Sequence, residues 1–286
     1  MTLKKVGNLK EFKIHFGPAG NPLNFFNSPL SKDRLAVSEW CASIGLNAEE
    51  RQMTYGARMK PEDAIRFGKI SKKFNVKLSV HGPYYVVLTS EKQRVLDNSV
   101  RELAKTCKLA ELMGATKVVF HPGFGADVKK VISGIKKVEK LKSNPVTICP
   151  ETMGKISQLG SLDQVLQICE NTESEPCIDF AHLHARHQGH PKTKLEFKRI
   201  LEEIENRLGK KSLKNLHCHF YPIEYTDKGE KVHRAVTEKN VFPQFQPFGE
   251  LIKEFKMTPT LISESKNSQD LGALEMKETM VKLGYY

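Results

Sequence analysis

The feature that most constrains this chain is a regular alternation of short apolar runs and longer amphipathic stretches along its 286 residues. Expected strands cover residues 11–16, 47–53, 76–81, 117–121, 146–151, 177–179, 215–220 and 260–264. Expected helices cover residues 31–44, 61–74, 90–113, 127–141, 162–169, 194–208, 248–255 and 268–283. Strict alternation is typical of parallel βαβ units, and eight units predict a closed α/β barrel, the (β/α)8 TIM barrel.

Nothing in the sequence divides this pattern into separate parts. No linker rich in Gly, Ser or Pro interrupts it, and no low-complexity tract or internal repeat is visible. Since the length also lies within the usual range of one such barrel, we expect residues 1–286 to form a single TIM-barrel domain.

Composition restricts the cellular compartments and the kinds of partner that suit this chain. Hydrophobic residues make up 39% of the chain, but no apolar run approaches the roughly 20 residues of a membrane span. The six cysteines are scattered without a Cys-x-x-Cys pair, and the first residues lack a signal-peptide core. We therefore expect reduced thiols, a cytoplasmic location and no membrane association. The net charge of +12 favours a polyanionic partner, although a merely basic housekeeping protein would share it.

Residue types that bind metals stand at the ends of six expected strands. They are His81, His121, Glu151, Asp179, His217 and Glu264. Four of the ten histidines also fall within residues 177–190, directly after one of these strands. Because the carboxyl ends of TIM-barrel strands line one mouth, where active sites lie, we expect the six side chains to converge there.

Imidazole and carboxylate groups are the natural ligands of zinc, and of manganese or iron where carboxylates dominate. Three histidines and three carboxylates are too many for one tetrahedral ion. Two ions about 3.5–4 Å apart and bridged by one carboxylate would use them well. The strand ends therefore predict a polynuclear metal site.

Short motifs at these strand ends resemble those of endonuclease IV, the zinc-dependent apurinic/apyrimidinic (AP) endonuclease family. The motifs are His81-Gly82-Pro83-Tyr84, Phe120-His121-Pro122-Gly123, Pro150-Glu151-Thr152, Asp179-x-x-His182 and Ser263-Glu264-Ser265. They run in the family's order over about the whole barrel. The resemblance implies two or three Zn2+ ions, with Mn2+ or Fe2+ as alternatives.

The resemblance also implies a role for each ligand. One ion would be held by His81 and His121, with Glu151 bridging to a second. The second would be completed by Asp179, His217 and Glu264, and a third would be held by His182 and His233.

Three features depart from the family pattern: one is Val87, where the family commonly has asparagine shortly after the Pro-Tyr pair, and the other two concern the metal ligands. Where the family has an aspartate two residues before the last histidine, this chain has the cation Lys231, so Glu230 is the nearest candidate to replace it, with Asp227 a weaker one. His219 competes with His217 for the second ion, because residues two apart on a strand project from the same face. A third ion is therefore expected to bind more weakly than the other two.

The activity implied by the resemblance is hydrolysis of double-stranded DNA on the 5′ side of an abasic site. A metal-bound hydroxide, oriented by Glu151, would leave a 3′-hydroxyl and a 5′-deoxyribose phosphate. Arg51, Tyr55 and Arg58, assigned to the second βα loop, and Tyr84 would contact DNA. A core position for Tyr84 and a solvated loop position for Arg58 are the alternatives. Such proteins are expected to act as monomers.

Two other functions are compatible with the same barrel. A sugar isomerase or epimerase also uses a one- or two-metal site of His, Glu and Asp, but its acid–base chemistry would favour glutamates and a lysine at strand ends. This chain has more histidines and a surplus of positive charge. A non-catalytic, metal-stabilised DNA-binding protein is the third interpretation.

Overall fold

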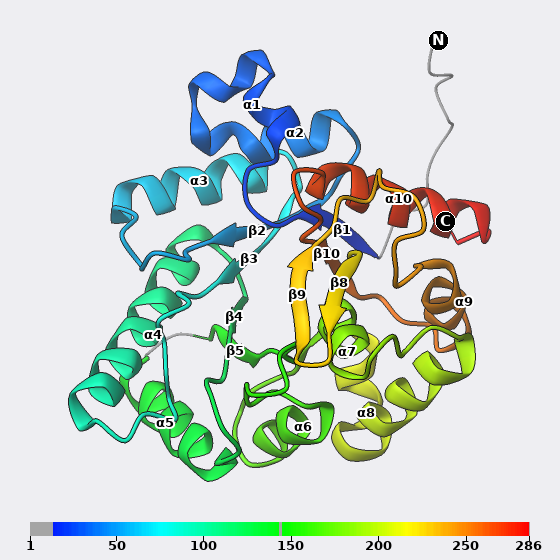
Figure 1. The fold of residues 1–286 in the computed structure, drawn as a ribbon. Helices are drawn as coiled ribbons and strands as arrows, with labels where there is room; N and C mark the ends of the chain where they lie inside the picture. The colour runs from blue at the N-terminus through cyan, green and yellow to red at the C-terminus, as the bar shows by residue number, and fades with distance from the viewer. Residues whose placement is uncertain (1–13, 143–144, 286) are drawn as a thin grey trace.

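The computed structural model describes residues 14–142 and 145–285, and they form a closed barrel of parallel strands inside a ring of helices (Figure 1). The expected TIM barrel is confirmed. The barrel strands are β1 His15–Pro18, β2 Ala48–Gln52, β3 Lys77–His81, β4 Lys117–Phe120, β5 Thr147–Pro150, β6 Cys177–Asp179, β7 His217–His219 and β10 Thr260–Ser263. Residues 11–13 of the first expected strand lie outside the described residues.

The strands pair as two four-stranded sheets, in the orders β2-β3-β4-β5 and β1-β10-β7-β6. Two isolated parallel bridges join the sheets, one between Ala19 and Glu50 and the other between Glu151 and Cys177. These bridges close the barrel, so all eight carboxyl ends open on one face.

The helices cover the outside of the barrel (Figure 1). They are α1 Leu23–Phe26, α2 Val37–Ser43, α3 Pro61–Lys73, α4 Gln93–Met113, α5 Val128–Leu141, α6 Leu162–Glu170, α7 Phe180–Arg186, α8 Lys194–Lys214, α9 Gln246–Glu254 and α10 Gln269–Lys282, with 3-10 turns η1 Pro29–Lys32 and η2 Arg34–Ala36. Among the described residues, none of the helices combines the length and apolarity that a membrane crossing requires.

The structure departs from the expected elements in three places. The helix expected over residues 31–44 begins as two 3-10 turns and becomes α-helical only at Val37. Helix α7 directly follows β6, because the side chain of Asp179 caps it by accepting a hydrogen bond from the His182 amide at 2.7 Å. The loop after β7 contains an unexpected antiparallel hairpin of β8, Ile223–Thr226, and β9, Gly229–His233.

Strand register sorts the polar side chains of the barrel into levels. Glu50 pairs with Ser79 across β2 and β3. Two residues further along both strands, Gln52 pairs with His81. Across β6 and β7, Cys177 pairs with His217 and Asp179 pairs with His219. Because successive strand residues face opposite sides, Glu49 and Arg51 face the helices instead. The upper level, at the mouth, consists of Gln52, His81, Asp179 and His219. The lower level, beneath it, consists of Glu50, Ser79, Cys177 and His217.

Candidate metal centre

Glu151, the residue after β5, lies at the middle of the mouth and is fully buried. Its Oε2 atom lies 3.1 Å from Nε2 of His81 and 3.1 Å from Nε2 of His121. Its Oε1 atom lies 3.2 Å from Nδ1 of His219 and 3.3 Å from Nδ1 of His182. One carboxylate therefore contacts imidazoles from four different parts of the barrel, the arrangement expected of a bridging ligand.

The surrounding donors fall into adjoining groups whose ligand atoms lie within 4.8 Å of one another. The groups are His81, His121 and Glu151; Glu151, Asp179 and His219; Glu50, His219 and Glu264; and His182, Glu230 and His233, and a fifth group, Cys177, His217 and His219, adds a thiol. These nitrogen and oxygen donor sets suit divalent ions such as zinc or manganese. The groups share Glu151 and His219, so the donors fit a centre with more than one ion.

Three histidines of the centre have one ring nitrogen engaged by a backbone carbonyl. Nδ1 of His81 lies 2.9 Å from the Gly82 oxygen, Nδ1 of His182 lies 2.9 Å from the Thr152 oxygen, and Nδ1 of His233 lies 3.1 Å from the Glu264 oxygen. A carbonyl oxygen only accepts, so each Nδ1 must carry the hydrogen that forms the bond. In the neutral ring, Nε2 then presents its lone pair toward the centre, as in protein metal sites.

Asp179 is held from two sides. Its Oδ2 atom accepts the Tyr221 hydroxyl at 2.8 Å, while Oδ1 caps helix α7. The Tyr221 hydroxyl also lies 3.2 Å from Nε2 of His233. Tyr221 therefore connects Asp179, beside Glu151, with the histidine of the hairpin.

The electrostatics of the centre favour positive charge. Burial alone would raise the pKa of Glu151, but the charges of His219 and His121 and their neighbours hold it well below its usual value. Burial would lower the pKa of His81, but the hydrogen bond and charge of Glu151 raise it to about 9. In the same way, Asp179 and Glu151 outweigh burial and raise the pKa of His182. Protons or metal cations are thus both stabilised here, and they compete for the same donor atoms.

The hairpin supplies the outer group of donors. Glu230 Oε2 lies 3.4 Å from Nε2 of His182, and Glu230 Oε1 lies 3.6 Å from Nε2 of His233. Lys231 is turned away from this group and pairs with Glu224 on the other hairpin strand. Glu230 therefore occupies the place next to the two histidines, and the cation beside it in sequence does not.

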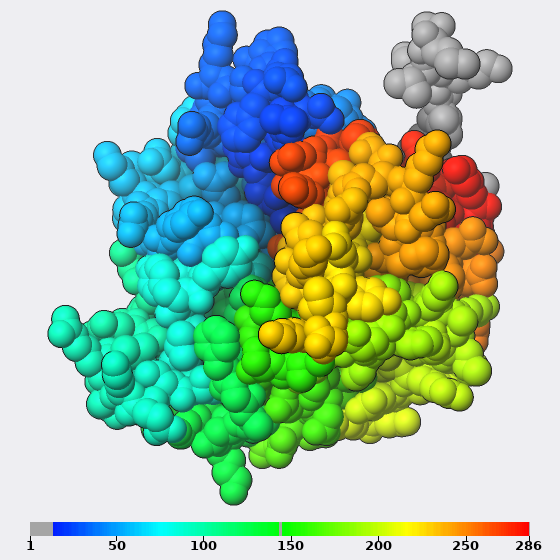
Figure 2. Space-filling view, viewed as in Figure 1, coloured from blue at the N-terminus to red at the C-terminus, as the bar shows by residue number. Residues whose placement is uncertain are grey.

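The hairpin is docked onto the segment that follows β5, and the two meet across the face of the molecule (Figure 2). The amide of Glu230 donates to the Gly154 oxygen at 3.1 Å. Gly229 has φ 89, and a Cβ atom there would lie 2.2 Å from the Gly154 oxygen, so only glycine permits this approach. Arg186 of α7 holds the same segment by donating to the carbonyls of Lys155 at 2.9 Å and Gln158 at 3.1 Å.

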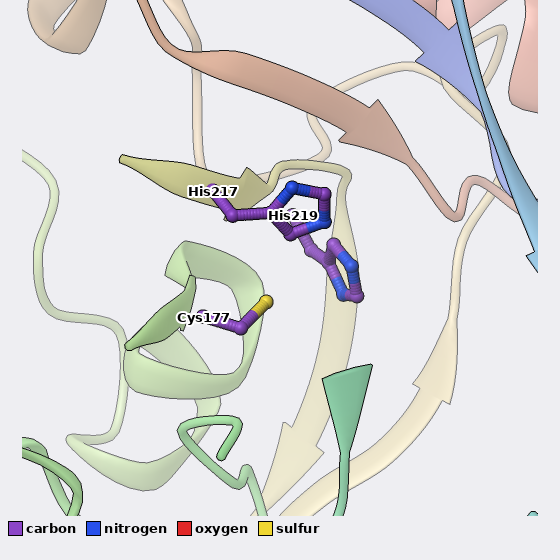
Figure 3. Close-up of side chains that lie close together, drawn as sticks. All are labelled: Cys177, His217 and His219. Atoms are coloured by element: carbon purple, nitrogen blue, oxygen red, sulfur yellow. The ribbon is translucent and has the colours of Figure 1, made fainter. Parts of the chain in front are cut away.

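His217 and His219 have different positions although they project from the same strand. Figure 3 shows both rings inside the barrel, with the Cys177 side chain of the neighbouring strand pointing toward them. His219 faces Glu151, whereas Nε2 of His217 lies 2.8 Å from Oε2 of Glu50, one level lower. The structure thus brings His219 among the carboxylates at the mouth and keeps His217 beneath them.

The residues expected to contact DNA are divided between two places. Arg51 lies in β2, not in the loop, which is a correction: its guanidinium donates to Asn21 at 2.9 Å and lies over the Phe67 ring. Tyr55 and Arg58 lie in the loop between β2 and α3, and Tyr55 is 81% exposed. Tyr84 is 57% exposed beside His121, so its core alternative is wrong.

Sequence reasoning missed Glu50 and Tyr221. Glu50 lies in a strand of four consecutive polar residues, Glu49 to Gln52, where no apolar alternation marks the inward face. Its only signal was its position two residues before a strand end. Tyr221 directly follows the expected strand over residues 215–220, at the place where the other strands carry a ligand.

Comparison with known proteins assigns the family. Residues 38–282 match the model of the xylose isomerase-like TIM barrel family, so the chain belongs to this family. Together with the grouped donors, this membership defines a metal-binding TIM-barrel enzyme.

Individual relatives are similar over different shares of the chain. The chain is 31% identical over 278 residues to the uncharacterized protein MJ0133 of Methanocaldococcus jannaschii, covering 94% of this chain and 97% of that protein. It is 31% identical over 221 residues to a probable endonuclease 4 of Staphylococcus carnosus, covering 70% and 73%.

Solved structures reproduce the fold. Endonuclease IV from Thermus thermophilus superposes with a TM-score of 0.67 at 16% identity, covering 94% of this chain and 98% of that one. A D-tagatose 3-epimerase-like protein superposes with a TM-score of 0.69 at 17% identity, with the same coverage. At such identities the likeness shows the fold alone.

Proposed function

We propose that this protein is a metal-dependent endonuclease that hydrolyses duplex DNA on the 5′ side of an abasic site. The observation that carries the proposal is the outer group of His182, Glu230 and His233, which adjoins the inner groups around Glu151. A sugar isomerase or epimerase of this barrel uses one or two ions, so it has no need of a third group of donors. A donor set with room for two or three ions suits an anionic phosphodiester better.

The relatives and the charge support the same class of substrate. The similar protein of Staphylococcus carnosus is named as a probable endonuclease 4. The chain carries a formal net charge of +12, which suits association with a polyanion. A small neutral sugar as the substrate would account for neither observation.

Exposed aromatic rings on consecutive loops offer a surface for bases and sugars. They are Tyr55 after β2, Tyr84 and Tyr85 after β3, and Phe124 after β4. Stacking on aromatic rings is a sequence-tolerant way to hold an unpaired nucleotide, and it suits a lesion that lacks a base. Tyr85 and Phe124 extend the surface expected from the sequence.

The residues of the centre would have different roles in the reaction. Divalent ions held by the grouped donors would supply Lewis acidity and lower the pKa of a coordinated water. Glu151 and Asp179 are fully buried, so they set the charge of the interior. His121, Glu230 and His233 keep part of their surface exposed, so the substrate phosphate would approach along their side.

The direct test is incubation of the protein with a DNA duplex that carries one abasic site, with Zn2+ and with excess chelator. We expect incision that leaves a 3′-hydroxyl, stops on chelation and returns with added Zn2+. Binding to the same duplex should weaken steeply with salt through counterion release. The matched control is an identical duplex without the abasic site.

The rival interpretation is examined with the same preparations. Epimerisation of a ketohexose such as D-tagatose, without incision of the abasic duplex, would overturn the proposal in favour of a sugar enzyme. Salt-dependent binding without either reaction would favour the non-catalytic DNA-binding interpretation. Incision that persists in excess chelator would remove the metal from the proposal.

A further inference from the structure

A second carboxylate lies one level below the metal centre, inside the barrel. Glu50 of β2 is fully buried, and its Oε2 atom accepts the Ser79 hydroxyl at 2.8 Å and lies 2.8 Å from Nε2 of His217. Its Oε1 atom lies 3.0 Å from Nε2 of His219. Among the described residues, neither Oε1 of Glu50 nor Nε2 of His219 has a hydrogen-bond partner, so the contact between these two buried atoms is an ion-pair contact. Both oxygens of Glu50 therefore contact imidazoles, and a ligand oxygen of Glu50 also lies within 4.8 Å of one of Glu264.

His219 is oriented differently from three other histidines of the centre. His81, His182 and His233 each face a backbone carbonyl with Nδ1, which leaves Nε2 toward the carboxylates. In His219 both ring nitrogens face carboxylates, because Nδ1 lies 3.2 Å from Glu151 and Nε2 lies 3.0 Å from Glu50. Nδ1 of His182 also lies 3.3 Å from Glu151, but it has the Thr152 carbonyl as a partner as well.

The direction of the His219 ring differs from that of His81, which also ends a strand paired on both edges but turns Nδ1 to the Gly82 carbonyl beyond its strand. His219 ends β7, which is paired with β6 on one edge and with β10 on the other. Backbone carbonyls in such a central strand point along the sheet to their ladder partners, not into the barrel. The Nε2 edge of His219 points down the barrel, where inward-facing side chains line the space, and Glu50 is the side chain that it meets.

We propose that Glu50 is a positioning residue for the metal centre: it fixes His219 with Nδ1 toward the ions and holds His217 out of the centre. Metal-ligating histidines generally need such a partner on the second ring nitrogen, and its loss typically costs about 10- to 100-fold in metal affinity. The proposal rests on the metal centre alone and applies whether the substrate is DNA or a sugar.

The neighbouring residue provides a matched control. Glu49 is equally buried, but its side chain faces the helix layer, where Oε2 accepts the Ser38 hydroxyl at 2.9 Å. Glu49→Gln and Glu50→Gln thus make the same exchange of a carboxyl for an amide at adjacent buried positions of one strand. Only the second change affects a residue that contacts His217 and His219.

Zinc affinity measured by chelator competition tests the proposal, with far-UV circular dichroism to verify folding. We expect Glu50→Gln to bind Zn2+ about 10- to 100-fold more weakly than the wild type, because one amide oxygen cannot accept from both imidazoles. Glu49→Gln should keep the wild-type affinity. Equal affinities for wild type and Glu50→Gln would overturn the proposal.

The ring orientation provides a second test that needs no stable variant at position 50. Proton–nitrogen correlation spectra of the zinc-loaded wild type, labelled with 15N-histidine, distinguish rings that carry the hydrogen on Nδ1 from those that carry it on Nε2. We expect His219, assigned with a His219→Asn variant, to carry the hydrogen on Nε2. A hydrogen on Nδ1 of His219 would contradict the proposal, even if the protein incises DNA.

Discussion

The inner and outer donors of the metal centre come from different elements of the fold. Glu151, Asp179 and His219 extend from strands of the closed barrel and are fully buried. Glu230 and His233 extend from the β8–β9 hairpin, and their side chains are 17% and 28% exposed. The inner donors are fixed by the barrel, whereas the outer ones depend on how the hairpin docks.

This difference means that the inner donors have fixed positions, whereas the positions of the outer donors depend on the hairpin. The inner donors cannot move without disturbing paired strands on both sides. The hairpin meets the barrel through the segment after β5, where Gly229 approaches Gly154 and Arg186 holds the Lys155 carbonyl. His182 belongs to both parts, since Nδ1 lies 3.3 Å from Glu151 and Nε2 lies 3.4 Å from Glu230. We expect the inner part to bind metal more tightly than the outer part.

The largest effect is expected from Glu151→Gln. A neutral amide cannot bridge two cations as a carboxylate does, and all four contacting imidazoles lose their charged partner. The activity under Proposed function should fall by more than about 100-fold, beyond the usual cost of losing a supporting residue. Metal analysis should also find fewer bound ions.

Glu49→Gln is the control, because it makes the same exchange at a buried position outside the centre. Its activity and metal content should equal those of the wild type. Full turnover by a folded Glu151→Gln variant would refute a bridging role for Glu151.

The inner part could be predicted from the sequence because its ligands stand where visible apolar runs end. His81, Glu151 and Asp179 each follow such a run, and barrel geometry brings strand ends together. The choice between His217 and His219 could not be made, because both face inward and only the level of Glu50 separates them. Periodicity reports which face a side chain occupies, not how high it stands in a barrel.

The outer part was less predictable for a different reason. Strands β8 and β9 are half-exposed and carry Glu224, Lys231 and other polar residues, so no apolar run marks them. Their turn contains Asp227, Lys228 and Gly229, which also reads as an ordinary loop. Glu230 was expected only as a substitute for a missing aspartate, and it is the docking of Gly229 that places it.

The intermediate effect is expected at the outer part. Under graded chelation, the ion held by His182, Glu230 and His233 should leave first, and activity should fall only partly at that step. Glu230→Gln should reproduce this state, with about a tenfold loss, the lower end of what a supporting group contributes. Metal content measured by mass spectrometry alongside activity follows both steps.

Lys231→Gln is the control for Glu230→Gln, because Lys231 lies next to it on β9 but pairs with Glu224. It should leave metal content unchanged. Loss of all ions in one step, or full activity of a Glu230→Gln variant that has lost an ion, would contradict the division into two parts.

The smallest effect is expected in the pH dependence of stability. It distinguishes the inner part of the metal centre from the outer part by the carboxylate that stabilises the protonated histidines. The pKa of His81 is raised to about 9 in the fold, mainly because the hydrogen bond and charge of Glu151 outweigh burial. A raised pKa stabilises the fold fully below the unfolded value of about 6.5, and this stabilisation is lost as the pH rises to 9. His217, whose pKa burial lowers to about 4, is neutral throughout this range and adds no change.

The melting temperature of chelator-treated protein should therefore fall by a few degrees between pH 6.5 and 9. Zinc-saturated protein should show a growing advantage over the same range, because the ions no longer compete with protons for the imidazoles. Glu151→Gln should remove most of the fall, since it removes the main partner of His81, while Glu230→Gln should keep it. A fall that persists in Glu151→Gln and disappears in Glu230→Gln would mean that the histidines beside Glu230, not those beside Glu151, stabilise the chelated protein.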